Sequence, residues 1–231
     1  MTLDNTSARG FELARLIDHT VLKPDASRAD VARHCDEALT HGFASVCVNG
    51  VHVWFVAERL KNSAVKTCAV LGFPLGASGA ESKAREAAFL VEAGADELDM
   101  VLDIGALREG DLARVEADMR AVRTACSGKV LKVIFETCLL DNAQKEAACR
   151  IALEVGADFV KTSTGFSTGG ATIDDVRLMR RAVGDALGVK ASGGIRDAQT
   201  ALAMVEAGAS RIGASASVAI ISGASGASAL Y

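Results

Sequence analysis

Apolar and polar residues alternate in blocks along this chain, and four of the blocks repeat one pattern. In each of them a helix-forming stretch ends at a glycine, a small or apolar residue follows, and a short strand begins. The four glycines are Gly42, Gly94, Gly156 and Gly208, which stand 52, 62 and 52 residues apart. Glycine suits this position because a helix often ends in a left-handed residue. Each interval is too long for one strand–helix unit and has room for two.

Further short strands fit between the four marked ones, so the pattern predicts eight strands. They are expected at residues 17–20, 45–49, 66–72, 97–102, 130–136, 158–163, 189–193 and 210–214. Ser27 and Thr172 have the sequence context of helix starts, and residues 80–93 contain strong helix formers without proline. Because strands that alternate with helices form parallel sheets, eight such units predict a closed (β/α)8 TIM barrel.

An open, doubly wound sheet is the competing arrangement. It is disfavoured because no glycine-rich nucleotide-binding motif follows the first predicted strand. A barrel of this kind commonly occupies about 250 residues as a single domain. We therefore expect residues 1–221 of the 231-residue chain to form one barrel. The Ser-, Gly- and Ala-rich stretch 222–231 is expected to be a flexible C-terminal tail.

Composition narrows the class of protein. Half of the residues are hydrophobic, which is enough for a large core, and the formal net charge of −4 does not indicate nucleic-acid binding. No apolar stretch is long enough to predict a membrane span, and residues 1–15 lack the apolar segment of a signal peptide. The six cysteines are scattered and form no C-x-x-C pair, as expected for reduced thiols in a cytoplasmic protein.

Charged residues occupy unusual places on several predicted strands. Lys161 and Lys190 each stand near the carboxyl end of a short apolar strand, before a glycine-containing turn. Buried strands rarely carry charges. Side chains alternate along a strand, so if Leu98 and Met100 face the helices, Asp99 points into the barrel.

The same alternation predicts a set of charged side chains that converge on the barrel interior. Its members are Asp18, Asp99 and Glu136 with Lys132, Lys161 and Lys190. Three acids balance three bases, so their burial is electrostatically feasible. One interpretation is a barrel stabilised by buried ion pairs, which fits Lys132 and Glu136 best. Lys161 fits a catalytic interpretation better, because barrel active sites lie at the carboxyl ends of the strands.

A pair of lysines in such a site permits one particular chemistry. A neutral lysine amine attacks a carbonyl group to form a Schiff base. With the reference pKa of about 10.4, roughly one lysine in 2,500 is neutral at pH 7. A neighbouring cation favours the neutral form, and Lys190 is placed to be that cation for Lys161. The resulting iminium is an electron sink for making or breaking a carbon–carbon bond, while Asp99 can move protons.

Glycine-containing loops follow the seventh and eighth predicted strands, at residues 192–196 and 212–215. Barrels frequently bind phosphate at these two positions, through backbone N–H groups and a helix N-terminus. The Gly193–Gly194 pair alone would indicate an ordinary tight turn. Two such loops together favour a phosphate site.

Five segments of the chain resemble the deoxyribose-phosphate aldolase family: residues 17–24, 97–101, 132–137, 159–166 and 189–196. The likeness extends from residue 13 to residue 221. It implies a class I aldolase on a (β/α)8 barrel, without metal or other cofactor. It also implies reversible cleavage of 2-deoxy-D-ribose 5-phosphate to acetaldehyde and D-glyceraldehyde 3-phosphate. A cytoplasmic homo-oligomer, a dimer or a tetramer, is expected from the same resemblance.

The resemblance assigns roles to individual residues. Lys161 would be the Schiff-base nucleophile, Lys190 the cation beside it and Asp99 the acid/base. The positions that it implies for substrate binding are Asp18, Thr20, Cys47, Lys132, Thr164, Gly165, Gly193, Gly194, Arg196, Gly213 and Ser215. Tyr231, the last residue and the only tyrosine, is a candidate proton shuttle. The chain departs from the family pattern at Ser217, where glycine is frequent.

Three other functions remain open from the residues alone. Another Schiff-base barrel aldolase, such as a transaldolase-like enzyme, would use the same lysine chemistry on a different substrate. A metal-free phosphosugar isomerase or a non-catalytic phosphate-binding barrel would need no imine-forming lysine. Tests with acetaldehyde as a substrate separate these possibilities.

Overall fold

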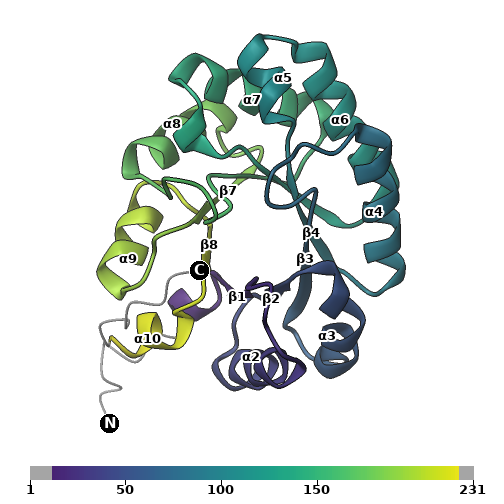
Figure 1. Cartoon of the computed structure of the whole chain (residues 1–231). Coiled ribbons are helices and arrows are strands. Elements are labelled where there is room, and N and C mark those ends of the chain that lie inside the picture. Colours follow the sequence, from purple (N-terminus) through teal and green to yellow (C-terminus); the bar gives the residue numbers. More distant parts are fainter. Residues whose placement is uncertain (1–11, 224–231) are drawn as a thin grey trace.

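Eight parallel strands close into a barrel in the computed structural model, which describes residues 12–223, and helices surround it (Figure 1). The strands are β1 (Ile17–Val21), β2 (Ser45–Val48), β3 (Lys66–Leu71), β4 (Glu97–Val101), β5 (Val130–Ile134), β6 (Phe159–Lys161), β7 (Gly188–Ser192) and β8 (Arg211–Ala214). Each neighbour in the sequence is a neighbour in the sheet, and β8 pairs with β1 to close it. The prediction of a (β/α)8 barrel is confirmed, with every strand boundary within two residues of the expected one.

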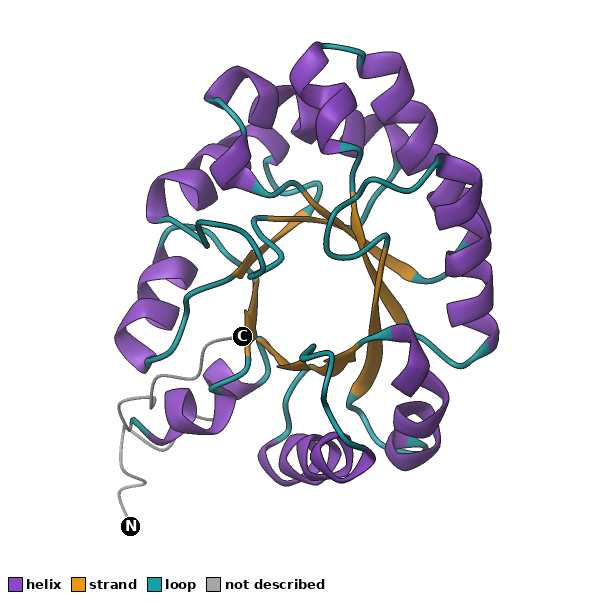
Figure 2. Ribbon diagram, viewed as in Figure 1, coloured by secondary structure: helices purple, strands orange, loops and turns teal. Residues whose placement is uncertain are grey.

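Helical segments connect the strands and form the outer layer (Figure 2). They are α2 (Arg28–His41), η1 (Gly50–His52), α3 (Val53–Leu60), α4 (Ala80–Glu92), α5 (Ile104–Glu109), α6 (Leu112–Ala125), η2 (Thr137–Leu139), α7 (Asn142–Val155), α8 (Ile173–Val183), α9 (Ala198–Glu206) and α10 (Ser217–Ser222). Within residues 12–223, the helices fall short of the length and apolar character that a membrane crossing requires.

Local sequence signals begin and end these helices as expected. Ser27 caps α2 by accepting a hydrogen bond from the Asp30 backbone N–H, and the Asp30 side chain accepts one in return from Ser27 N–H. Thr172 caps α8 by accepting a hydrogen bond from the Asp175 backbone N–H. At the other ends, Gly42 and Gly156 adopt the left-handed conformation, with φ of 68° and 76°. These four predictions are confirmed, and they set where α2, α7 and α8 begin or end.

The main hydrophobic core lies between the strands and the helices. Leu98 and Met100, on the outer face of β4, are fully buried in it. A smaller apolar group, which includes Cys47 and Cys68, lies apart from this core. The thiols of all six cysteines are free. Because the apolar side chains of the strands point outward to the helices, their polar neighbours are left to fill the barrel.

The amino end of the barrel interior is filled by Phe159. A Cβ atom on Gly188, its neighbour in register on β7, would lie 2.2 Å from the Phe159 ring, so only glycine leaves room for it. The Arg211 guanidinium carbon stands 5.3 Å from the centre of the same ring. Phe159 and Arg211 thus form the floor beneath the charged residues.

The expected boundary between barrel and tail falls at the end of the described residues. The last helix, α10, ends at Ser222. The predicted tail lies outside the described residues from position 224 onward, and so does Tyr231. The division at residue 221 and the proton-shuttle role of Tyr231 therefore stay predictions.

Candidate active site

Charged side chains from six strands, β1 and β4 to β8, meet inside the barrel. Lys161 and Lys190 are direct neighbours in the register of β6 and β7, and Asp99 faces Lys132 across β4 and β5. Side chains of Asp99, Lys132 and Lys190 are completely buried, while Lys161, at the carboxyl end of β6, retains 3% exposure. The predicted convergence is confirmed for these four residues.

The Asp99 carboxylate is the centre of the arrangement. Its Oδ2 atom accepts hydrogen bonds from Lys161 Nζ at 2.7 Å and from Lys190 Nζ at 2.6 Å. Its Oδ1 atom accepts one from Lys132 Nζ at 2.6 Å. One carboxylate therefore holds three lysines, and a proton on any of the three ammonium groups can reach it directly.

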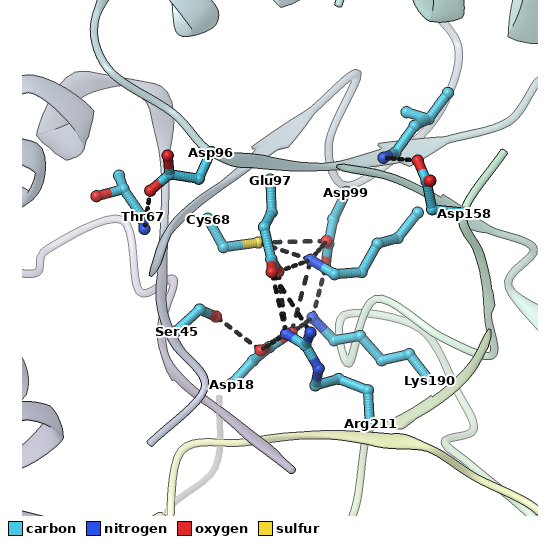
Figure 3. A network of polar contacts seen from close by, with 12 residues as sticks. Asp18, Ser45, Thr67, Cys68, Asp96, Glu97, Asp99, Asp158, Lys190 and Arg211 are labelled. Carbon is cyan, nitrogen blue, oxygen red and sulfur yellow. Dashed lines mark hydrogen bonds and ion pairs between the residues drawn. The ribbon is translucent and has the colours of Figure 1, made fainter. Parts of the chain in front are cut away.

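Asp18 forms the second centre, on the opposite side of the barrel (Figure 3). Its Oδ2 atom accepts a hydrogen bond from Lys190 Nζ at 2.5 Å, and its Oδ1 atom accepts bonds from Arg211 at 2.6 Å and from Ser45 at 2.7 Å. Lys190 is therefore held between two carboxylates, Asp18 and Asp99. These contacts give Asp18 a supporting position beneath the site.

Two charged residues of the cluster escaped the sequence analysis. Glu97 lies 2.7 Å from Lys132 Nζ, and Arg211 bonds both Glu97, at 3.0 Å, and Asp18. The signal was available, because Glu97 stands two residues before Asp99 and Arg211 two residues before Gly213, on the same strand faces. We call these seven residues the barrel charge cluster: Asp18, Glu97, Asp99, Lys132, Lys161, Lys190 and Arg211.

The barrel charge cluster has four bases and three acids. Asp18, Glu97 and Asp99 are balanced by three cations that lie deeper than Lys161, namely Lys132, Lys190 and Arg211. Lys161 is thus the surplus base, at the open end. Loss of one proton from the cluster would make it neutral, and Lys161 is the base at the open end, where a substrate can approach it.

Burial and charge act in opposite directions on the pKa values of the cluster. Burial raises the pKa of Asp99, but the positive charges of Lys132, Lys161 and Lys190 together lower it by a larger amount. The pKa of Asp99 therefore lies well below its ordinary range. The pKa of Asp18 is lowered in the same way, against burial, by the cations around it. Burial lowers the pKa of Lys132 and Lys190, but the carboxylates outweigh it and both pKa values are raised. At neutral pH Lys190 therefore stays a cation.

These directions predict how folding stability depends on pH. The unfolded chain binds protons on Asp18 and Asp99 near pH 3.9, whereas the folded-state pKa values are lower. The contribution of these carboxylates is complete well above pH 3.9 and is lost as the pH falls through the folded-state values. The raised lysines contribute fully below about pH 10.4 and lose their contribution as the pH rises through their folded-state values.

Urea unfolding at a series of pH values tests this dependence. We expect the unfolding free energy to fall steeply below about pH 4, by about 1.4 kcal/mol per pH unit for each carboxylate involved. In an Asp99→Asn variant, the slope of the unfolding free energy against pH below pH 4 should be smaller by about 1.4 kcal/mol per pH unit, which corresponds to one proton. An unchanged slope would contradict the assignment of Asp99 as an ionised, paired group.

Glu136 does not join the cluster, and this part of the prediction is wrong. The alternation that placed it beside Lys132 stops at Ile134, where β5 ends. Glu136 itself adopts a left-handed conformation with φ of 59°. Its carboxylate is buried against the backbone N–H and the hydroxyl group of Thr164. Burial raises its pKa, and it braces the loop that follows Lys161.

The predicted phosphate-loop residues gather at the carboxyl ends of β6, β7 and β8. Gly165, Gly193 and Gly194 have positive φ of 87°, 91° and 79°, which only glycine adopts readily. A Cβ atom on Gly193 would lie 3.0 Å from Gly170 Cα, so the loops after β6 and β7 are in close contact. Their backbones therefore surround the mouth above Lys161.

Four other residues that were predicted to bind the substrate differ in whether their side chains can contact a ligand. Arg196 is half-buried and has no hydrogen bond or ion pair to any residue from 12 to 223, and Ser215 is exposed. By contrast, Thr20 donates its hydroxyl to the backbone oxygen of Asp18, and Cys47 is completely buried. Arg196 and Ser215 are thus free to meet a ligand, while Thr20 and Cys47 belong to the wall.

The loop after β8 is held by the residue that departs from the family pattern. Ser217 Oγ lies 2.9 Å from the backbone oxygen of Ala214 and 2.9 Å from His19 Nδ1. The other ring nitrogen of His19 lies 2.7 Å from the Glu37 carboxylate on α2. Serine at position 217 therefore ties this loop to β1 and α2.

After β7, the N-terminus of α9 is already capped by the Asp197 carboxylate, which leaves the loop N–H groups as the anion donors there.

Metal ligation competes poorly with these ion pairs. Ligand atoms of Cys47, Cys68 and Asp99 lie within 4.8 Å of one another, and so do those of Asp18, Cys68 and Glu97. The carboxylates in both groups already accept bonds from buried cations. A metal ion would have to displace these ammonium groups or lie beside them, and like charges repel.

The fold and the site together define a class of protein. A (β/α)8 barrel with a lysine at the open carboxyl end, held beside a carboxylate and a second lysine, is typical of barrel enzymes that work through a lysine amine. Comparison with known proteins then shows the family. Residues 13–230 match the model of the DeoC/LacD family aldolases, and the chain belongs to this family.

Similar proteins carry consistent names. The chain is 58% identical over 227 residues to a deoxyribose-phosphate aldolase of Rhodospirillum rubrum, covering 98% of this chain and 94% of that protein. It is 57% identical over 213 residues to deoxyribose-phosphate aldolase 1 of Bacillus licheniformis, covering 92% and 96%. A putative deoxyribose-phosphate aldolase structure from Coccidioides immitis has a TM-score of 0.89 at 41% identity, covering 96% and 87%.

One further structural relative is described as a tetramer. The deoxyribose phosphate aldolase of Aeropyrum pernix has a TM-score of 0.86 and 34% identity, with 96% of this chain and 97% of that chain covered. The likeness extends over nearly the whole barrel in every one of these comparisons.

Proposed function

We propose that this protein is a class I aldolase that reversibly cleaves 2-deoxy-D-ribose 5-phosphate to acetaldehyde and D-glyceraldehyde 3-phosphate. Lys161 is the Schiff-base nucleophile. The observation that carries the proposal is the sharing of Asp99 Oδ2 by Lys161 Nζ, at 2.7 Å, and Lys190 Nζ, at 2.6 Å. The names of the similar proteins support the choice of substrate.

Asp99 receives the proton that makes Lys161 a nucleophile. The amine of Lys161 attacks the substrate aldehyde, and the carbinolamine loses water to form an iminium. Both steps need a proton acceptor and donor within hydrogen-bond reach, which Asp99 supplies. Because the pKa of Asp99 is lowered by its three lysines, it begins the cycle as a carboxylate and acts first as a base. Lys190 remains a cation and takes no covalent part.

The iminium then draws electrons from the adjacent carbon–carbon bond. The bond between the second and third carbons breaks, and the hydroxyl on the third carbon loses its proton as that carbon becomes the aldehyde of D-glyceraldehyde 3-phosphate. The two-carbon enamine left on Lys161 is protonated at carbon and hydrolysed to acetaldehyde. Asp99 is the nearest carboxylate to Lys161 Nζ and serves these proton transfers.

The phosphate group is proposed to bind at the loops after β6, β7 and β8. Gly193 and Gly194 have positive φ and turn the backbone sharply after β7, Gly194 is exposed, and Arg196 is half-buried without a charged partner in the described part of the chain. An arginine in this position suits a phosphate oxygen. Gly165, Gly213 and Ser215 complete the proposed phosphate site.

Borohydride trapping tests the nucleophile. Reduction of the protein with sodium borohydride in the presence of acetaldehyde should fix an ethyl group on one lysine, and peptide mass mapping should find it on Lys161. Lys132 and Lys190 should stay unlabelled, because they are completely buried and paired. An active enzyme in which Lys161 carries no adduct would disprove the mechanism.

We further propose that the protein acts in the cytoplasm as a homo-oligomer. The tetrameric relative supports an oligomer, and six free cysteines suit a reducing compartment. Light scattering of the full chain distinguishes a dimer from a tetramer. Tyr231 remains a proposed proton shuttle, and its removal should slow exchange of the acetaldehyde methyl protons.

A further inference from the structure

Two buried hydroxyl groups in the site have no hydrogen-bond partner. Ser163 is completely buried and Ser192 is 5% exposed, and the Oγ atoms of both lack a partner among residues 12–223. A buried hydroxyl without a partner costs free energy. Because both serines follow a lysine of the barrel charge cluster by two residues, such a cost indicates that a ligand bound there supplies the missing bonds.

The position of Ser192 is set by its neighbours. Thr162 Oγ1 donates to the Ser192 backbone oxygen and accepts from its backbone N–H, both at 3.0 Å. Ser192 faces Gly213 in register, and a Cβ atom on Gly213 would lie only 2.3 Å from Ser192 Oγ. Glycine at position 213 therefore makes space for this hydroxyl. The backbone is clamped, so the hydroxyl is presented in a fixed place.

Both serines lie between the lysines and the glycine loops. Ser192 is the last residue of β7 and follows Lys190 by two residues, so its hydroxyl shares the inward direction of that lysine. Ser163 lies beyond the end of β6, and a Cβ atom on Gly193 would lie 3.4 Å from its Cβ, which places Ser163 beside the phosphate loop. At about 3.3 Å per residue along β7, Ser192 stands about 6–7 Å nearer the mouth than Lys190. Gly193, the first glycine of the phosphate loop, comes directly after Ser192. The serines are thus level with the middle of a substrate that reaches from Lys161 to the phosphate loops.

We propose that Ser163 and Ser192 determine specificity by hydrogen-bonding the C4 hydroxyl of 2-deoxy-D-ribose 5-phosphate. This inference rests on the proposed function and adds the group that the two serines recognise. The C1 carbon is bound to Lys161 and the C5 phosphate to the loops, and the C3 oxygen must be left to the acid/base. The C4 hydroxyl is the remaining polar group, and a serine can both donate to it and accept from it.

Two acceptors that differ only in this hydroxyl provide the test. In the synthesis direction, with acetaldehyde, D-glyceraldehyde 3-phosphate carries the hydroxyl and 3-oxopropyl phosphate lacks it. We expect Ser192→Ala and Ser163→Ala each to lower kcat/KM for D-glyceraldehyde 3-phosphate by about tenfold. The loss for 3-oxopropyl phosphate should be much smaller, so the preference between the two acceptors falls by a similar factor.

Controls separate this effect from damage to the fold or to the lysine chemistry. Ser82→Ala, the same change on an exposed position of α4, should leave the preference unchanged. Because Ser192→Ala removes an unpaired buried hydroxyl, its melting temperature should be equal to or above that of the unmodified protein. Equal losses for both acceptors, or no loss for either, would overturn the proposal. Failure of the proposed function is a different result, namely no acetaldehyde adduct on Lys161 of the unmodified protein.

Discussion

Replacing Lys161 with arginine is expected to abolish carbon–carbon bond cleavage, with kcat/KM reduced by about 10⁴-fold or more. A guanidinium keeps the positive charge beside Asp99 but cannot lose its proton at accessible pH, so it cannot attack an aldehyde. The borohydride adduct with acetaldehyde should disappear together with the activity. Steady-state kinetics in the cleavage direction measures the first effect, and mass mapping measures the second.

Lys66→Arg is the matched control for this experiment. Lys66 is also a lysine on a barrel strand, but it is the exposed first residue of β3, at the opposite end of the barrel from Lys161. The same substitution there should leave kcat/KM within about twofold, as is usual for exposed positions. Residual cleavage by Lys161→Arg at more than a few per cent would mean that another lysine is the nucleophile.

Replacing Asp99 with asparagine is expected to lower both activity and stability. The barrel charge cluster, with all of its groups ionised, would change from a net charge of +1 to +2, because a neutral amide replaces the carboxylate that pairs with three ammonium groups. Breaking a buried ion pair by removing one partner costs about 3–5 kcal/mol. Urea denaturation measures this loss. Activity should fall as well, since no other carboxylate bonds Lys161 Nζ within the described chain.

A double variant separates the two effects. Lys132→Met removes the deepest ammonium partner of Asp99, so Asp99→Asn/Lys132→Met restores the net charge of +1. We expect it to recover a substantial part of the stability lost in Asp99→Asn, and a double-mutant cycle gives the coupling. Activity should not return, because the proton acceptor beside Lys161 is still missing. A double variant that is stable and active would show that Asp99 is structural alone.

The sequence was sufficient to predict the barrel because its signals are local. Glycine after a helix and alternation along a strand depend on only a few neighbouring residues, and both located Asp99, Lys161 and Lys190 correctly. Applied fully, the same alternation would have found Glu97 and Arg211. Glu136 was placed wrongly because the alternation continued past Ile134, where the strand ends and the backbone turns left-handed.

The pairing within the cluster could not be predicted in the same way. Which carboxylate bonds which lysine depends on the register between strands and on the closure of β8 against β1, which brings Asp18 beside Arg211. The space for Ser192 Oγ depends on the missing side chain of Gly213, one strand away. Both are properties of the closed barrel and of no single segment.

Because Asp99 Oδ2 bonds both Lys161 and Lys190, the protein needs little rearrangement during one catalytic cycle. A protonated amine and an iminium both place one positive charge on the nitrogen of Lys161, 2.7 Å from Asp99 Oδ2. The iminium keeps one N–H that can point to the same oxygen. The surrounding charges therefore experience nearly the same field before and after the covalent bond forms. Dipoles that are already oriented need not be reorganised when the intermediate appears, so the buried ion pairs around this lysine are an advantage for the reaction.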